Sequence, residues 1–151
     1  MKLAGIILFW LLWPLIWVYA PLKLRARVLI MYKDEFLVVK PYFGSGFWQL
    51  PGGGVGINED AQTAAKREVF EETGIDLSHL ILHTIEPSLS LKEKGLNMRY
   101  ALFSVVLTKK PKVDLQPREI LTYTWLKISH KTYLDFHVAH AVQRTLTSTK
   151  H

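Results

Sequence analysis

The stretch GGVGINEDAQTAAKREVFEETGI, residues 53–75, decides the fold, because it predicts a helix that turns acidic side chains toward a sheet. Helical composition begins at Asn58 and continues to Thr73. Gly74 follows, and glycine is the residue best suited to the left-handed position just past a helix. The spacing therefore predicts one helix over residues 58–73.

The acidic residues of this helix lie where local electrostatics disfavours them. At 100° per residue, Glu68 and Glu72 fall within roughly 20° of Ala61, which starts the small apolar stripe, and Glu71 lies on the adjoining flank. The negative end of the helix dipole costs each of them roughly 0.3 to 1 kcal/mol, and like-charge neighbours add to this cost. A divalent cation would reverse these terms, because carboxylates are hard oxygen ligands. Three glutamates on a helix are also typical of a solvated face, so both interpretations remain open at this point.

A longer pattern surrounds the glutamates. From Gly53 to Ile75 the sequence resembles the Nudix box, G-x5-E-x7-R-E-U-x-E-E-x-G-U with U aliphatic, at every specified position. Such a match would arise by chance with a probability on the order of 10⁻⁸ per starting position. The resemblance implies an α/β fold, the Nudix-type α/β/α sandwich with a mixed sheet, over residues 24–146. The matching positions of the box are Gly53, Glu59, Arg67, Glu68, Glu71, Glu72 and Gly74.

The resemblance also implies an activity and a cofactor. Nudix-type pyrophosphohydrolases cleave a pyrophosphate bond in a nucleoside diphosphate linked to another moiety, with Mg²⁺ or Mn²⁺. Carried over to this chain, Glu68, Glu71 and Glu72 would be metal ligands, and the carbonyl of Gly52 could complete the site. The expected catalytic residues are Glu68, Glu72, Arg67 and Glu119. Attack on a diphosphate requires neutralised oxygens and an acidified water, which such a metal supplies.

Supporting roles follow from the same resemblance. Glu68 is the preferred group for deprotonating the attacking water. Arg67 would orient the acids, with Glu59 as its structural partner rather than a ligand. Family members often recruit another acid from a loop across the cleft. The first candidate for it is Glu119 and the second is Asp114, although either could be an ordinary solvated loop residue.

The rest of the chain alternates predicted strands and helices, as expected of a mixed sheet with helices packed on it. Runs of β-branched and aromatic residues predict the strands, and the first two form a hairpin around a polar turn at residues 33–35. The predicted strands are 25–32, 36–40, 80–85, 98–107 and 120–128, and a last helix is predicted over 133–146.

The N-terminal segment is strongly hydrophobic. Residues 3–22 carry no formal charge and would cover roughly 30 Å as a helix, which is just long enough to span a bilayer. This predicts a membrane anchor over residues 1–22, followed by a Nudix hydrolase domain over 23–151. A cleaved signal peptide and a helix lying in the interface are the alternatives. The domain is expected to face the cytoplasm, because more basic residues follow the segment than precede it: Lys23, Arg25 and Arg27 against Lys2.

Composition narrows the function classes. The 151 residues carry a net charge of +6 and no cysteine, which excludes disulfides, thiolate metal sites and a cysteine nucleophile. The charge favours phosphate-rich or anionic partners. The expected partner is a nucleotide-type small molecule, with nucleic acid expected only as an RNA 5′ end. Two alternatives remain: a Nudix-like module that binds a nucleotide or RNA 5′ end without cleaving it, and a hydrolase of a membrane-borne diphosphate.

Basic residues outside the box have two interpretations each. Arg27, Lys40 and Arg99 could contact phosphates or be ordinary surface charges. The run KKPK, residues 109–112, predicts a solvated turn.

Overall fold

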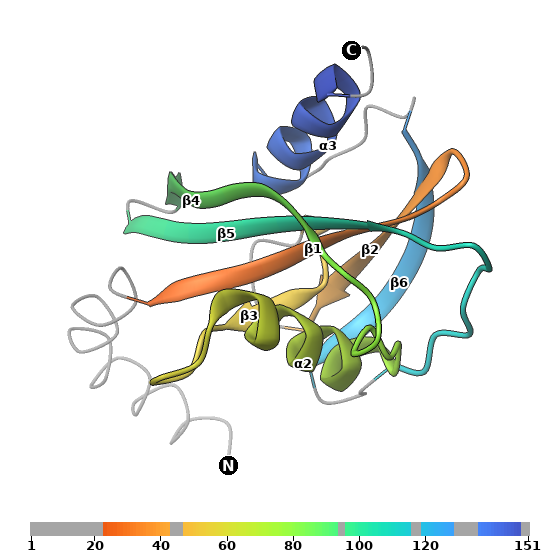
Figure 1. Ribbon diagram of the computed structural model, residues 1–151, viewed down its shortest axis with the longest axis horizontal. Coiled ribbons are helices and arrows are strands. Elements are labelled where there is room, and N and C mark those ends of the chain that lie inside the picture. The colour runs from red at the N-terminus through yellow and green to blue at the C-terminus, as the bar shows by residue number, and fades with distance from the viewer. Residues whose placement is uncertain (1–22, 43–46, 94–95, 116–118, 129–135, 149–151) are drawn as a thin grey trace, which may run out of the picture.

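The computed structural model describes residues 23–42, 47–93, 96–115, 119–128 and 136–148, and shows a mixed α/β architecture. Along the described chain three strands precede one helix, three strands follow it, and a second helix comes last (Figure 1). The elements are β1 (Leu24–Tyr32), β2 (Glu35–Pro41), β3 (Gly52–Gly54), α2 (Ala61–Thr73), β4 (His83–Glu93), β5 (Leu96–Val106), β6 (Ile120–Lys127) and α3 (Phe136–Ser148).

One six-stranded sheet organises the chain, in the order β4-β5-β1-β2-β6, with the short β3 paired to β1. The pair β1 and β5 is parallel, and the other pairs are antiparallel. The predicted mixed sheet is therefore confirmed. The predicted hairpin is also confirmed, since Tyr32 pairs with Glu35 across a turn in which Lys33 adopts a φ of 55°.

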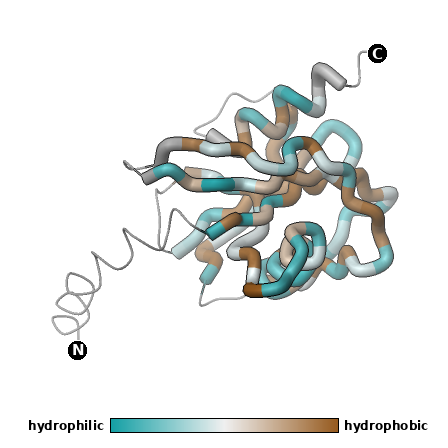
Figure 2. Tube along the Cα trace, turned by 60° about the vertical axis from the view of Figure 1, so that its left-hand side comes forward, coloured by the Kyte–Doolittle hydropathy of each residue, from teal (hydrophilic) through white to brown (hydrophobic). Residues whose placement is uncertain are grey.

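The helices cover opposite faces of the sheet. Strand β1 shows how the residues divide, because alternate side chains of a strand point to opposite faces. Val28 and Ile30 belong to the core that contains the buried residues of α2, whereas Leu29 and Met31 belong to the core that contains the buried residues of α3. Figure 2 shows hydrophobic stretches in the middle of the domain, with hydrophilic positions on the helices at its edges. The arrangement is the expected α/β/α sandwich.

Helix α2 is shorter than its composition predicted. It begins at Ala61 rather than Asn58, because the Asp60 side chain caps it by accepting the N–H groups of Gln62 and Thr63, both at 3.0 Å. Asn58 itself has a φ of 61° and lies outside the helix. The predicted C-terminus is confirmed, since Gly74 adopts the left-handed conformation with a φ of 69°.

The strand predictions differ from the structure mainly around β4 and β3. The predicted strand 80–85 is wrong at its start, because β4 begins only at His83 and continues to Glu93. Pro87 lies within β4, which the structure accommodates because β4 is an edge strand with register shifts on both sides of Glu86. Strand β3 was not predicted, since three consecutive glycines have low strand propensity and β1 supplies the pairing.

The two ends of the chain leave some predictions without a test. Residues 1–22, the predicted anchor, lie outside the described residues, and so do residues 133–135 of the predicted last helix. Within the part that is described, no helix is long and apolar enough to cross a membrane.

Candidate active site

Helix α2 turns two of its glutamates toward the sheet. Glu72 is 8% exposed, and the Glu68 side chain is 16% exposed. Glu71 lies on the flank, with its side chain 53% exposed. The helical spacing thus gave the correct orientation for all three. The side of α2 that carries Glu68 and Glu72 faces β3 and β1, the elements that the helix contacts most.

Glu72 is the most deeply placed acid of this group. Its Oε2 accepts a hydrogen bond of 2.8 Å from the backbone N–H of Gly52. Burial raises the pKa of the Glu72 carboxyl to about 7, against the opposing effects of the Arg27 charge and the Gly52 hydrogen bond. The negative charges of Glu68 and Glu119 raise the same pKa further. Glu72 therefore lies within electrostatic reach of both.

Arg27 provides the buried positive charge beside Glu72. The residue is 6% exposed, and its guanidinium donates hydrogen bonds to the backbone carbonyls of Leu50, at 3.0 Å, and Gly52. It also donates to Oε1 of Gln49 at 3.3 Å. The interpretation of Arg27 as surface charge is wrong, because the segment that precedes β3 closes over it. One signal was available in the sequence, an arginine within the otherwise apolar strand run ARVLIM.

Arg67 ties the surrounding acids together. Its guanidinium donates twice to Glu59, both at 2.9 Å, once to Glu68 at 2.8 Å and once to Glu71 at 3.1 Å. It also donates to the carbonyl of Gly54 at 3.1 Å. The hydrogen bond from Arg67, followed by that from the Gly56 N–H, lowers the pKa of the Glu59 carboxyl. Arg67 therefore contacts Glu59, Glu68 and Glu71 at once, while the roles expected of Arg67 and Glu59 stay predictions.

The glycines of β3 allow a close approach between backbone and helix. A Cβ atom on Gly53 would overlap the carboxylate of Glu68, and one on Gly52 would overlap the carbonyl oxygen of Ala26. A Cβ on Gly54 would meet no atom within 4 Å. Gly53 therefore sets the distance between β3 and Glu68 of α2, and Gly52 sets the distance between β3 and β1.

The two candidates for an additional acid lie in different places. Glu119 precedes β6, its backbone carbonyl accepts the N–H of Tyr42 at 2.8 Å, and its charge acts on Glu72. Asp114 lies beside the C-terminal cap of α2, where its N–H donates to the carbonyl of Thr73 at 2.8 Å. Of these two residues, the structure brings Glu119 into the electrostatic surroundings of the acidic helix face.

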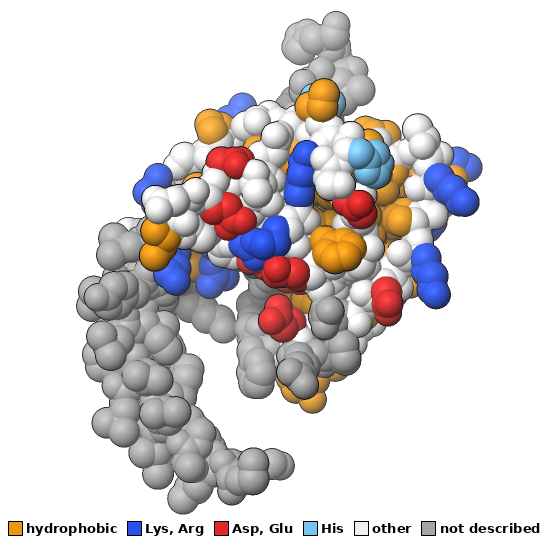
Figure 3. All heavy atoms as spheres, turned by 60° about the horizontal axis from the view of Figure 1, so that its bottom comes forward, with side chains coloured by type: hydrophobic (Ala, Val, Ile, Leu, Met, Phe, Trp, Pro, Cys, Tyr) orange, Lys and Arg blue, Asp and Glu red, His pale blue; other side chains and the backbone are white. Residues whose placement is uncertain are grey.

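The donor set fits a hard divalent cation in chemistry. Glu68, Glu71 and Glu72 offer carboxylate oxygens, and the buried Glu72 has two acidic neighbours whose repulsion a cation would relieve. Among the described residues, however, no three acidic or imidazole side chains are already gathered around one point. Arg67 pairs with one oxygen each of Glu68 and Glu71, and the Gly52 carbonyl accepts from Arg27. Figure 3 shows acidic and basic side chains side by side on the face formed by α2.

Comparison with known proteins places this geometry in context. A MutT NUDIX hydrolase from Burkholderia pseudomallei has the same fold, with a TM-score of 0.71 at 19% identity, covering 81% of this chain and 96% of the other. The 8-oxo-dGTP diphosphatase of Buchnera aphidicola is 29% identical over 122 residues, which are 78% of this chain and 90% of that protein. The RNA pyrophosphohydrolase of Pelagibacter ubique is 40% identical over 63 residues, and the chain spans 40% of its length.

The family comparison covers most of the molecule. The model of the NUDIX domain matches residues 21–142, from just before β1 into α3. This range includes the acidic helix, the glycines of β3 and Arg27. The chain belongs to the Nudix family.

Proposed function

We propose that this protein is a divalent-metal-dependent pyrophosphohydrolase that cleaves a phosphoanhydride bond in a nucleoside diphosphate linked to another moiety. The observation that carries the proposal is the inward-facing pair Glu68 and Glu72 on α2, with Glu72 held by the Gly52 N–H. Burial raises the pKa of the Glu72 carboxyl to about 7, and a bound cation would favour its charged form. Family membership supports the same activity.

The residues have distinct roles in this proposal. Glu68, Glu71 and Glu72 would hold the metal, with the Gly52 carbonyl as a further donor. When bound, the metal neutralises phosphate oxygens and acidifies a water. Arg67 fixes the directions of Glu68 and Glu71 through its hydrogen bonds.

Different residues would accept the proton of the attacking water and hold the Glu72 side chain. Glu68 would accept the proton of the attacking water, since one of its carboxylate oxygens makes no hydrogen bond to Arg67. Arg27 and the Gly52 N–H hold Glu72 in place. Glu119 would add a carboxylate from the side of β6.

The relatives support a nucleotide-type substrate. One relative is named for 8-oxo-dGTP and another for RNA, and both names describe a phosphoanhydride attached to a nucleoside. The second name favours one further candidate, removal of diphosphate from an RNA 5′ end, which the net charge of +6 also suits. A module that only binds is disfavoured, because every acid of the box is retained.

A substrate panel tests the proposal. The protein is incubated with Mg²⁺ or with Mn²⁺ and with normal and oxidised nucleoside triphosphates, ADP-ribose, dinucleoside polyphosphates, 5′-triphosphate RNA and a lipid diphosphate. The expected result is metal-dependent release of phosphate-containing products from one nucleotide class, abolished by chelation. Hydrolysis that is unaffected by chelation, or preferred cleavage of the lipid diphosphate, would contradict it.

Gly53→Ala should lower activity while leaving the fold intact. The new methyl group would overlap only the end of the Glu68 side chain, which can rotate away but then leaves its position. We expect kcat to fall about tenfold or more, with a change in unfolding free energy below about 1 kcal/mol. Gly54→Ala is the matched control, because its methyl group meets open space. Equal activity of the two variants would count against the position assigned to Glu68.

We also propose that residues 1–22 anchor the protein in a membrane, with the domain in the cytoplasm. The support is the uncharged run over residues 3–22. The full chain should sediment with membranes and resist alkaline extraction. Leu8→Lys with Leu12→Lys should release it, because a lysine near the bilayer centre costs roughly 3 kcal/mol. Recovery of the wild-type chain in the supernatant, or of a chain shortened at its N-terminus, would refute the anchor.

A further inference from the structure

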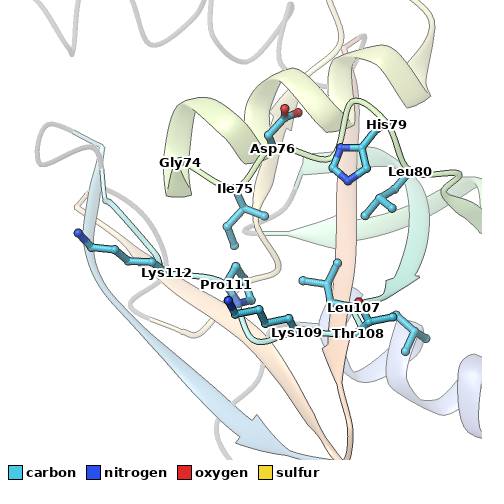
Figure 4. Close-up of a pocket in the computed structure, with 11 residues that line it drawn as sticks. Gly74, Ile75, Asp76, His79, Leu80, Leu107, Thr108, Lys109, Pro111 and Lys112 are labelled. Atoms are coloured by element: carbon cyan, nitrogen blue, oxygen red, sulfur yellow. The ribbon is translucent and has the colours of Figure 1, made fainter.

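A cavity of about 310 Å³ lies beyond the C-terminal end of α2. One wall is the segment that follows α2, with Ile75, His79 and Leu80, and the other is the segment that follows β5, with Leu107 and Lys109. Figure 4 shows these side chains approaching one another from the two segments. None of the box glutamates, nor Glu119, lines this cavity.

Hydrogen bonds hold both walls of the cavity. The segment after β5 is joined to β1 by the Leu107 N–H, which donates to the Met31 carbonyl at 2.8 Å. The segment after α2 is held by Lys66, whose Nζ donates to the Ser78 carbonyl at 3.2 Å. The two are linked where Asp114 bonds to the end of α2. The cavity is therefore preformed, as small-molecule sites usually are.

The charge around the cavity is predominantly positive. Lys109 and Lys112 line it, and among the described residues neither ammonium group has an anionic partner. Lys110 differs, since it pairs with Glu35 at 2.5 Å and lies over the Trp125 ring. His79 lies on the opposite wall, and the Lys109 side chain runs past Pro111 toward the Lys112 side of the cavity (Figure 4).

The single acid of the lining is already engaged. The Asp76 carboxylate accepts the Ser78 N–H at 2.8 Å and points away from the Lys109 side of the cavity (Figure 4). The floor is apolar, formed by the buried Ile75 and the half-buried Leu107 and Pro111. A ligand that packs on the apolar floor and pairs with the lysines at the rim needs an apolar body and an anionic group.

We propose that this cavity is a second binding site, for a small phosphate monoester with an apolar body. Its volume lies at the lower end of the range for small-molecule pockets, which suits a ligand of that size. The phosphate would lie against the wall formed by the segment after β5, beside Lys109 and with Lys112 at the rim. The site does not depend on the proposed hydrolase activity, because it uses none of the residues assigned to it.

The separation from the glutamates permits a clean test. Without divalent metal, the acids of α2 repel anions, so that binding to metal-free protein reports the cavity. Full-length protein in non-ionic detergent and EDTA is titrated with phenyl phosphate while backbone amide signals are followed by NMR. We expect saturable shifts at Gly74–Leu80 and Leu107–Lys112. Inorganic phosphate and benzyl alcohol should each bind more weakly, since each lacks one half of the ligand.

Substitution locates the phosphate. Lys109→Gln with Lys112→Gln should weaken phenyl phosphate roughly threefold to tenfold. The matched control, Lys33→Gln with Lys127→Gln, removes two lysines elsewhere and should leave affinity unchanged. Shifts confined to other segments, equal affinity in the two double variants, or inorganic phosphate binding as tightly as phenyl phosphate would overturn the proposal.

A second titration identifies the source of the ligand. Dihexanoyl phosphatidic acid presents the same phosphate monoester on a soluble lipid. If either probe binds saturably and the Lys109 and Lys112 substitutions weaken that binding, the site is supported. The probe that binds more tightly then shows whether the ligand is a lipid or a soluble ester. We expect the soluble ester to bind more tightly. Leu24 follows the proposed membrane anchor at the start of β1, whereas Met31, next to the cavity, is near the other end of that strand. Failure of both probes overturns the proposal.

Discussion

Replacing Glu72 by glutamine is expected to abolish hydrolysis and, in the absence of metal, to stabilise the fold. Glutamine keeps an oxygen that can accept the Gly52 N–H, but removes the charge that would hold the cation. We expect kcat to fall at least about a hundredfold, the usual scale for a group that stabilises charge in the transition state. The measurement is turnover of the best substrate from the panel, at saturating Mg²⁺ or Mn²⁺.

The gain in stability follows from the pKa of Glu72. Burial raises it from 4.5 to about 7, so that between these values the folded state binds more protons than the unfolded state. The stability contributed by this group is full below about pH 4.5 and is lost as the pH rises through about 7. The loss amounts to roughly 3 kcal/mol. Urea unfolding of metal-free wild type should show this decline, and Glu72→Gln should not.

Metal and a control variant complete this test. Adding Mg²⁺ or Mn²⁺ should stabilise the wild type at pH 8 and have little effect on Glu72→Gln, because a ligand stabilises only the state that binds it. Glu35→Gln makes the same chemical change at the exposed pair with Lys110, and should retain activity. A Glu72→Gln variant with more than a tenth of wild-type turnover would show that the metal role is wrongly assigned.

Gly52→Ala is expected to destabilise the protein by about 3 kcal/mol or more. Gly52 has a φ of 133°, a conformation that residues with a Cβ rarely adopt. The methyl group would also overlap the backbone oxygen of Ala26 on β1, which cannot move without disturbing the sheet. Chemical denaturation of the metal-free protein measures the effect.

The variant Gly54→Ala is the control that distinguishes backbone strain at Gly52 from a general effect of adding a methyl group to β3. Gly54→Ala occupies the same short strand, has no neighbour within 4 Å of its new atom, and should change stability by less than about 0.5 kcal/mol. Wild-type stability of Gly52→Ala would show that β3 can shift away from β1. Equal destabilisation of both variants would show that the conformation of Gly52 is not the cause.

The sequence predicted the elements that local rules govern. Helix α2 ends at Gly74, and its glutamates face the expected sides, because helical periodicity alone sets those directions. The fold class followed from the Nudix box. The start of α2 was wrong by one turn because the cap at Asp60 competes with the helical composition of residues 58–60.

Contacts between distant segments account for what the sequence did not predict. Arg27 is buried because the carbonyls of Leu50 and Gly52 close over it. The apolar run ARVLIM around it was the one signal in the sequence, and that run does not identify these distant partners. Strand β3 exists because β1 pairs with it. The directions of the glutamates were predictable from the sequence. The partners that hold the Arg27 guanidinium beside Glu72 were not.

The parallel pair of β1 and β5 has a consequence for synthesis. Leu24 at the start of β1 pairs with Arg99 of β5, although β2, β3, α2 and β4 lie between them in the sequence. Such distant pairing closes late and slows folding. Strand β1 therefore cannot pair with β5 until β5 has left the ribosome. Helix α2 cannot pack on the complete sheet before then. During that interval the nascent chain exposes apolar strands, so that we expect the unfinished domain to depend on chaperones.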